Sequence, residues 1–189
     1  INSDKTGTLT MNAMTATTML AGGQWYKIEG SGYSKTGAVL GPAGQTTPDF
    51  VRLGLGLTLC SDATVADDES IIGDPTEAAL VVLAAKFGVD DEATRRSLPR
   101  VAQVPFDSEY KFMATLHDVP PGATGGFASF GHFMCVKGAP DVVIDRCSGA
   151  AWNGDRKAMA EAKADLLAAN RELSEKGLRV LAFAARGLH

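Results

Sequence analysis

The amino-acid sequence predicts an α+β fold in which a mostly antiparallel, twisted β-sheet is flanked by helices. Runs rich in β-branched and aromatic residues indicate strands, and several of them are joined by short turns, which favours antiparallel pairing. Helix-like runs lie between them in irregular order. This order differs from the strict strand–helix alternation of a parallel βαβ protein, so the α+β class fits best.

The first third of the chain is predicted to hold a hairpin, a loop and a helix. Two strand-like runs flank Gly22–Gly23, which predicts a β-hairpin. Residues 34–49 are rich in Gly, Pro and Thr and predict a loop. A helix is expected over residues 49–63, although Gly54 and Gly56 lower its intrinsic propensity.

A stronger helix is predicted over residues 74–88. Asp74 can cap its first turn, Pro75 suits the first helical position, and Gly88 suits the end. A short helix is expected to follow at residues 90–98.

Strands dominate the next part of the chain. Strand-like runs at residues 100–106 and 111–119 flank a short turn and predict a second hairpin. A loop rich in Gly and Pro at residues 120–126 leads to another predicted strand at residues 127–136. A short helix is expected to begin at Pro140.

A long helix is predicted from Asp155 to Lys176, ended by Gly177. A final strand is expected at residues 178–185. One face of the long helix carries apolar side chains at helical spacing: Met159, Ala162, Leu166, Ala169 and Leu173.

Composition limits the classes of function. The chain has 189 residues, of which 45% are hydrophobic and 21% charged, as in an ordinary globular protein. Its net charge of -4 argues against a general nucleic-acid or anionic-membrane binder, so any phosphate ligand must be held by a local site. No apolar run approaches the roughly 18 residues that a membrane span needs, and the polar residues from Asn2 onward do not predict a signal peptide. The three cysteines favour a reducing compartment, without a disulfide framework or zinc site.

The run DKTGTLT, which starts at Asp4, carries groups suited to phosphoryl transfer. A carboxylate such as Asp4 can attack a phosphoryl group and hold it as an aspartyl-phosphate. Phosphoryl transfer needs positive charge and hydrogen-bond donors to stabilise the negative charge that develops on the phosphate. Lys5 supplies a cation and Thr6 a hydroxyl, and magnesium usually supplies further positive charge. Gly7 lets the backbone approach a ligand closely. A bare Asp-x-Thr would be an ordinary polar turn, but seven consecutive residues favour the chemical interpretation.

This run resembles the phosphorylation motif of P-type ATPases, the ion pumps of the haloacid-dehalogenase-like superfamily. The resemblance implies that Asp4 is the phosphorylated residue, that Lys5 and Thr6 complete the catalytic set, and that Asp4 and Thr6 hold Mg²⁺ in the full-length protein. Asn2 stands where the family usually has Cys.

Two further runs are similar to nucleotide-domain motifs of the same family. GDPTEAAL implies that Glu77 faces an adenine pocket, although Asp74 and Glu77 also suit a capping-box-like helix start. PFDSEYKFM implies that Phe106 stacks on adenine and that Lys111 binds the nucleotide. The alternative is a core Phe at a strand end and a solvated Lys. Tyr110 replaces the basic residue that is more usual there.

Two more resemblances complete the candidate site. VKGAPDVVIDRC resembles a family motif with Asp141 in place of Glu, and implies that Lys137 and Gly138 line the nucleotide pocket. Alone, it is also a plain strand-to-helix turn with an exposed Lys. KGLRVLAFAAR implies that Arg179 reaches the ATP phosphates.

Five motifs in the family's order identify the chain as similar to the nucleotide-binding (N) domain of a type II-like P-type cation-transporting ATPase. The resemblance implies an N-domain-like fold, with residues 1–12 as the end of a phosphorylation-domain strand and hinge, 13–182 as the nucleotide-binding domain, and 183–189 as the return hinge. Thr8–Asn12 and Phe183–Arg186 are expected to run side by side.

The same resemblance implies ATP as ligand, with Mg²⁺ in the full-length protein, and a place as a cytoplasmic domain of an integral membrane protein. Partners would be the phosphorylation, actuator and transmembrane domains of the same chain. The isolated fragment is expected to be monomeric and to bind nucleotide without turnover. The sequence leaves the transported ion open, with calcium suggested only by the type II likeness.

Two other classes of function stay open at this point. A haloacid-dehalogenase-like phosphatase could use Asp4, but it would need a second acid where Thr6 stands. A non-catalytic interaction domain could use the same motifs for structural purposes alone.

Overall fold

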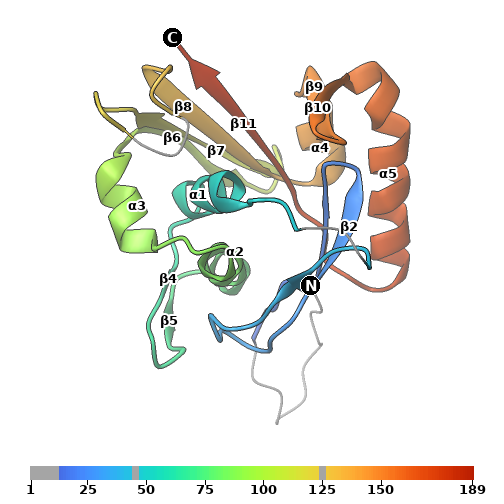
Figure 1. Cartoon of the computed structure of the whole chain (residues 1–189), viewed down its shortest axis with the longest axis horizontal. Coiled ribbons are helices and arrows are strands. Elements are labelled where there is room, and N and C mark those ends of the chain that lie inside the picture. The colour runs from blue at the N-terminus through green and yellow to red at the C-terminus, as the bar shows by residue number, and fades with distance from the viewer. Residues whose placement is uncertain (1–12, 44–46, 124–126) are drawn as a thin grey trace.

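The computed structural model describes residues 13–43, 47–123 and 127–189, and its centre is a four-stranded antiparallel sheet (Figure 1). The strands lie in the order β11-β8-β7-β6, so β6 and β11 form the two edges. Their bounds are β6 (Arg100–Asp107), β7 (Phe112–Asp118), β8 (His132–Gly138) and β11 (Ala182–Leu188). Fold class is therefore α+β with antiparallel pairing, as predicted.

The helices and three small sheets lie below this sheet and to one side of it in the view of Figure 1. The helix α1 packs against the sheet, α2 and α3 contact α1, and α4 follows β8 directly and packs with α5. The helices are α1 (Val51–Leu59), α2 (Pro75–Lys86), α3 (Asp91–Ser97), α4 (Pro140–Ile144) and α5 (Met159–Glu175). The small sheets contain β1 (Thr18–Ala21), β2 (Gln24–Ile28) and β3 (Val39–Leu40); β4 (Thr64–Val65) and β5 (Ile71–Ile72); and β9 (Gly149–Trp152) and β10 (Asp155–Ala158).

The main core lies between α1 and the inner face of the sheet. Alternate residues of β7 are buried, beginning with Met113, because successive side chains of a strand point to opposite faces. The register places Met113 opposite Lys137, and Lys137 opposite Phe183, so these three residues share the inner face. Leu59 and Cys60 from the end of α1 complete this cluster.

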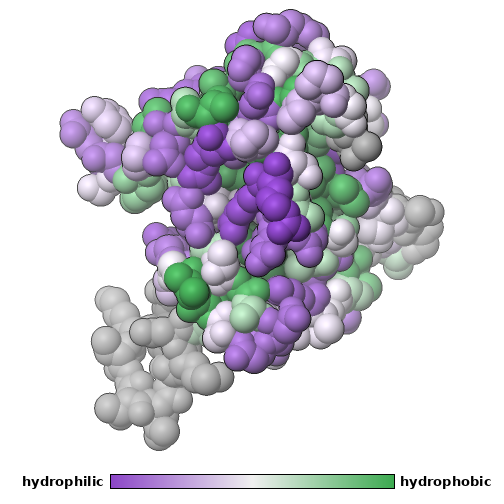
Figure 2. Space-filling model, turned by 90° about the vertical axis from the view of Figure 1, so that its left-hand side faces the viewer, coloured by the Kyte–Doolittle hydropathy of each residue, from purple (hydrophilic) through white to green (hydrophobic). Residues whose placement is uncertain are grey.

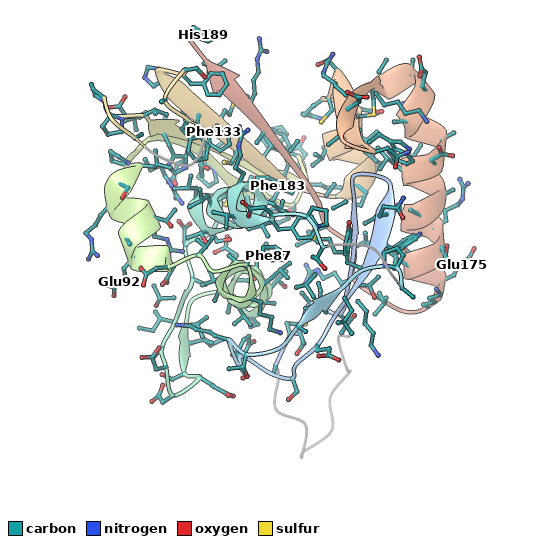
Figure 3. The ribbon with its side chains drawn as sticks, in the orientation of Figure 1. Phe87, Glu92, Phe133, Glu175, Phe183 and His189 are labelled. Carbon is teal, nitrogen blue, oxygen red and sulfur yellow. The ribbon has the colours of Figure 1, made fainter. Side chains whose placement is uncertain are left out.

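The two glycines of α1 allow this close packing. A Cβ at Gly56 would lie 2.3 Å from the Phe183 ring, and a Cβ at Gly54 would lie 2.8 Å from Val89. Figure 3 shows Phe183 beside α1. The glycines that lower the helix propensity of this segment therefore let α1 approach both the sheet and the segment after α2.

Several predicted elements are confirmed. The first hairpin turns at Gly22–Gly23, between paired Ala21 and Gln24. Asp74 caps α2, because its Oδ1 accepts hydrogen bonds from the backbone N–H groups of Thr76 and Glu77 at 2.9 and 3.1 Å. The predicted helices in residues 49–63, 90–98 and after Pro140 are present as α1, α3 and the short α4.

The predicted start of the long helix at Asp155 is wrong. Residues Asp155–Ala158 form β10, which pairs with β9, and α5 begins only at Met159. The cause is the dipeptide Asn153–Gly154, whose φ values of 50° and 86° suit a two-residue hairpin turn. The Asn-Gly turn therefore places residues 155–158 in β10, the second strand of this hairpin, and the helix begins only after that strand ends.

Other boundaries also differ from the prediction. The strand expected at residues 127–136 begins at His132, because Phe127 turns into the core and packs edge-on against Phe133 at 4.6 Å between ring centroids. The last strand, β11, begins and ends later than residues 178–185. The predicted loop at residues 34–49 contains the short strand β3, and the paired strands β4 and β5 had no sequence signal.

Figure 2 faces the α3 side of the molecule, where hydrophilic residues cover most of the surface and hydrophobic residues form separate areas. Across residues 13–43, 47–123 and 127–189, the helices lack the combination of length and apolar character that a bilayer crossing requires.

His117 is a titratable group inside the core, with only 2% of its surface exposed. Its Nδ1 lies 3.0 Å from the Leu98 carbonyl oxygen and donates a hydrogen bond to it. Its Nε2 has no hydrogen-bond partner in the described part of the chain. Burial, together with the charge of Arg100, lowers the pKa of His117 below its ordinary 6.5, so the folded protein holds a neutral ring.

We expect acid to destabilise this core through His117. The unfolded chain takes up a proton near the ordinary pKa of 6.5, whereas the folded chain does so only at lower pH. The free energy of unfolding should therefore fall as the pH drops below that value, by at most about 1.4 kcal/mol per pH unit from this group. Urea denaturation at several pH values tests this against His117→Gln, with His132→Gln, an exposed histidine on β8, as control. Equal acid sensitivity in the parent and His117→Gln would contradict it.

Candidate functional site

Lys137 lies at the end of β8 and points into the protein, with only 7% of its surface exposed. Its Nζ donates a hydrogen bond to Glu77 Oε1 at 2.8 Å and another to the backbone carbonyl of Cys60. Met113 Sδ lies 3.1 Å from the same nitrogen. The amine is therefore enclosed by β7, α1 and α2, contrary to the plain turn with an exposed Lys that the sequence left open.

Glu77 lies in the first turn of α2 and uses both carboxylate oxygens. Oε1 accepts from Lys137, and Oε2 accepts from the backbone N–H of Asp62 at 2.8 Å. In a capping box this carboxylate would instead accept from the N–H of Asp74. Asp74 does cap the helix, but Glu77 forms an ion pair with a residue that lies 60 positions further along the chain.

This ion pair has little contact with water. Loss of one partner of such a pair leaves an unpaired buried charge and costs about 3–5 kcal/mol. Cys60 lies beside it, but burial raises the pKa of the Cys60 thiol and keeps it uncharged. Glu77 is therefore the anion that balances Lys137.

Gly138 and Lys111 meet at the same end of the sheet. The Lys111 carbonyl accepts a hydrogen bond from the Ala139 N–H at 2.9 Å, and Lys111 has a φ of 59°. A Cβ at Gly138 would lie 2.3 Å from the Lys111 carbonyl oxygen and 2.7 Å from the Phe112 Cα. Gly138 is therefore required for the close approach of β7 and β8, while the Lys111 side chain is exposed to solvent.

Phe106 lies near the end of β6 and is 61% exposed. It belongs to an irregular part of the strand, because the register between β6 and β7 shifts between Val104 and Asp107. The alternative of a core Phe is thus wrong, and the ring is accessible to a ligand.

Arg179 lies in the segment before β11, and its side chain reaches the first turn of α2. Its Nη1 donates a hydrogen bond to Thr76 Oγ1 at 3.3 Å. Thr76 precedes Glu77, so Arg179 and Lys137 both bond to side chains in the first turn of α2. This contact is a second link between motifs that are far apart in the sequence.

The structure brings part of the predicted set together. Glu77 contacts Lys137 directly, Gly138 adjoins Lys111, and Arg179 reaches the residue before Glu77. Phe106 is exposed on the edge strand. Three predicted catalytic residues lie outside the described residues: Asp4, Lys5 and Thr6. The segment Thr8–Asn12 also lies outside them, so its expected pairing with Phe183–Arg186 stays a prediction. The segment Phe183–Arg186 belongs to β11 and pairs with β8.

Sequence reasoning missed the backbone partners of the ion pair. The Cys60 carbonyl and the Asp62 N–H carry no pattern that a sequence could reveal. Thr76 and Met113 were also missed, although both lie inside motifs that resemble those of the family. Within the part of the chain that the structure describes, groups of three or more His, Cys, Asp or Glu placed to hold a metal are absent.

The fold and the site define an α+β domain whose antiparallel sheet carries a buried Lys–Glu pair and further cationic side chains at one end. Residues 49–189 match the family model described as P-type ATPase, cytoplasmic domain N. The chain therefore belongs to this family.

Curated relatives agree with the family model. The chain is 35% identical over 196 residues to the cation-transporting ATPase pma1 of Synechocystis sp., covering 97% of this chain and 20% of the relative. It is 35% identical over 185 residues to calcium-transporting ATPase 1 of Lactococcus lactis, covering 97% and 19%. It is 31% identical over 194 residues to the calcium-transporting ATPase of Bacillus subtilis, covering 98% and 21%. The chain thus spans about a fifth of the length of these relatives.

We expect Gly138→Ala to lower the free energy of unfolding of the domain. The added methyl group would overlap the Lys111 carbonyl and the Phe112 backbone, so β7 and β8 must separate. Overpacking of this kind costs about 1–3 kcal/mol of unfolding free energy. Urea denaturation measures the loss. Gly131→Ala is the matched control, because its Cβ would have its nearest neighbours at 3.9 Å. Equal stability of the two variants would show that the close approach at Gly138 is unimportant.

Proposed function

We propose that this chain is the ATP-binding domain of a P-type cation-transporting ATPase. The parent protein would couple ATP hydrolysis, through an aspartyl-phosphate on Asp4, to the movement of a cation across a membrane. The observation that carries the proposal is the buried pair of Glu77 and Lys137, which joins two of the motifs on which the family resemblance rests.

The exposed surroundings of this pair suit a nucleotide. Phe106 offers an accessible aromatic face, and every nucleobase can stack on such a face. Lys111 adds an exposed cation next to Gly138. Arg179 is exposed beside the start of α2, and a guanidinium binds phosphate oxygens in a fork-like geometry. In this proposal the base lies against Phe106, the Glu77–Lys137 pair borders the pocket, and Arg179 meets the phosphates.

The phosphoryl acceptor and its metal belong to the motif at Asp4. The family resemblance assigns Mg²⁺ to Asp4 and Thr6, where it would neutralise the charge of the transferred phosphoryl group. These residues lie outside the described part of the chain, so the proposal derives no step through the ion. Two relatives are named for calcium transport, which makes calcium the first ion to test in the full-length parent.

Substitution of Phe106 tests the base-binding part. Loss of one base–aromatic stack weakens binding by about 1–3 kcal/mol, or roughly 5- to 150-fold, so Phe106→Ala should lower ATP affinity by that factor. Adenosine should lose a similar factor, because the stacked part is the base. Calorimetric titration measures both ligands. Tyr110→Ala is the matched control, since Tyr110 is an exposed aromatic (55%) in the same hairpin and should leave affinity unchanged.

Two outcomes would contradict this part of the proposal. A folded Phe106→Ala protein that binds ATP as the parent does would remove Phe106 from the site. A parent chain without saturable changes in its NMR spectrum on ATP titration would favour an interaction domain over a nucleotide-binding one.

Arg179→Ala should weaken ATP binding more than adenosine binding. A hydrogen bond to a charged group contributes about 1.5–3 kcal/mol, so the loss for ATP should be about tenfold or more, while adenosine lacks the phosphate partner. Arg171→Ala, which removes an exposed arginine from α5, is the control for net charge. An equal loss for ATP and adenosine would place Arg179 away from the phosphates.

A further inference from the structure

The turn that follows α1 holds the Glu77–Lys137 pair through two backbone groups. The Cys60 carbonyl accepts from Lys137 Nζ, and the Asp62 N–H donates to Glu77 Oε2 at 2.8 Å. Both groups depend on the orientation of the same short stretch of main chain. A rotation of this turn would remove one partner from the lysine and another from the glutamate.

Arg100, at the start of β6, holds this turn from its other side. Its Nη2 donates to the Leu59 carbonyl at 2.9 Å, and its Nη1 donates to Asp62 Oδ1 at 2.6 Å. The guanidinium therefore contacts the residue before Cys60 and the side chain of Asp62. Arg95 adds bonds from α3 to the carbonyls of Ser61 and Ala63 at 3.0 and 2.8 Å.

The end of α1 needs such donors. The last four carbonyls of a helix lack partners within the helix, and the last turn of α1 has no basic residue of its own. Arg100 of β6 donates to the Leu59 carbonyl, and Arg95 of α3 lies 3.5 Å from the Thr58 carbonyl. The planar guanidinium fixes its partners in two directions at once, which a single ammonium group cannot do.

An open cavity lies beside the turn, on the side of the two arginines. Its volume is about 240 Å³. Its lining includes Leu59, Ser61, Asp62, Arg95, Arg100 and His117. Cys60 and Ser61 are fully buried, so packing and the arginine contacts together fix this stretch of main chain.

We propose that Arg100 is a positioning residue for nucleotide binding. It fixes the turn after α1, the turn fixes Lys137 and Glu77, and these two side chains border the nucleotide pocket; the last step rests on the proposed function. Arg100 acts through the turn and needs no contact with the ligand.

A measurement without ligand tests the positioning step. In the parent chain the Lys137 amine is enclosed and should react slowly with acetic anhydride, as followed by mass spectrometry of peptides. Arg100→Gln should raise this rate severalfold. Lys86 is the internal reference, because its Nζ is held by the Glu29 carbonyl (2.7 Å) in another part of the protein, and general loosening would raise both rates. Arg96→Gln, an exposed arginine of α3, is the matched control.

Nucleotide titration tests the functional consequence. Arg100→Gln should weaken ATP binding by about threefold to thirtyfold, the range for residues that act through others. Arg96→Gln should bind as the parent does. If Arg100→Gln fails to fold, Asp62→Ala serves instead, since it removes the Asp62 half of the Arg100 anchor at an exposed side chain and should raise the Lys137 rate by a smaller factor.

The outcomes separate this inference from the proposed function. An unchanged Lys137 rate in folded Arg100→Gln overturns the positioning role whatever ATP does. A raised rate with unchanged ATP affinity overturns the link to binding. A parent that binds no ATP overturns the proposed function, and the Lys137 rate then still decides whether Arg100 fixes the turn.

Discussion

The described structure depends most on one buried ion pair, between Lys137 and Glu77. It joins the end of β8 to the start of α2, and its remaining hydrogen-bonding capacity is met by backbone groups after α1. A charge buried in this way is tolerated only when it is paired and hydrogen-bonded. The pair therefore imposes a geometric condition on three elements at once. Those elements must meet at one point before either side chain can be enclosed.

The packing of α1 meets this condition. Gly54 and Gly56 let the helix lie close to Val89 and Phe183, which brings the C-terminal end of the helix to the inner face of the sheet. In this position the backbone carbonyl of Cys60 accepts a hydrogen bond from the Lys137 amine. The same register that places Lys137 between Met113 and Phe183 determines that its side chain points inward. A slip of one residue would turn it to the other face.

Much of the fold was predictable, because its signals are local. Gly22–Gly23 sets a hairpin, and Asp74 with Pro75 starts a helix, through chemistry confined to a few residues. Asn153–Gly154 is an equally local signal for a hairpin turn. The apolar spacing that follows it led to the wrong prediction of a helix from Asp155. The family motifs predict the side chains of the candidate site, and that assignment stays a prediction, but the groups that hold Glu77 and Lys137 in place carry no sequence signal. The Cys60 carbonyl, the Asp62 N–H and the guanidinium of Arg100 meet only in the folded chain, and backbone groups are identical in every sequence.

Charge explains how an acidic chain can still suit an anionic ligand. The net charge of -4 gives no long-range attraction for phosphate. Among the assigned residues that the structure describes, however, Lys111 and Arg179 are exposed cations, while the one carboxylate, Glu77, is already paired with Lys137. Because water and salt screen exposed charges over about 8–10 Å, a ligand at this end of the sheet experiences these neighbours more than the whole-molecule charge. The pairing of Glu77 thus has a second consequence besides stability: the Lys137 amine offsets the negative charge of this carboxylate.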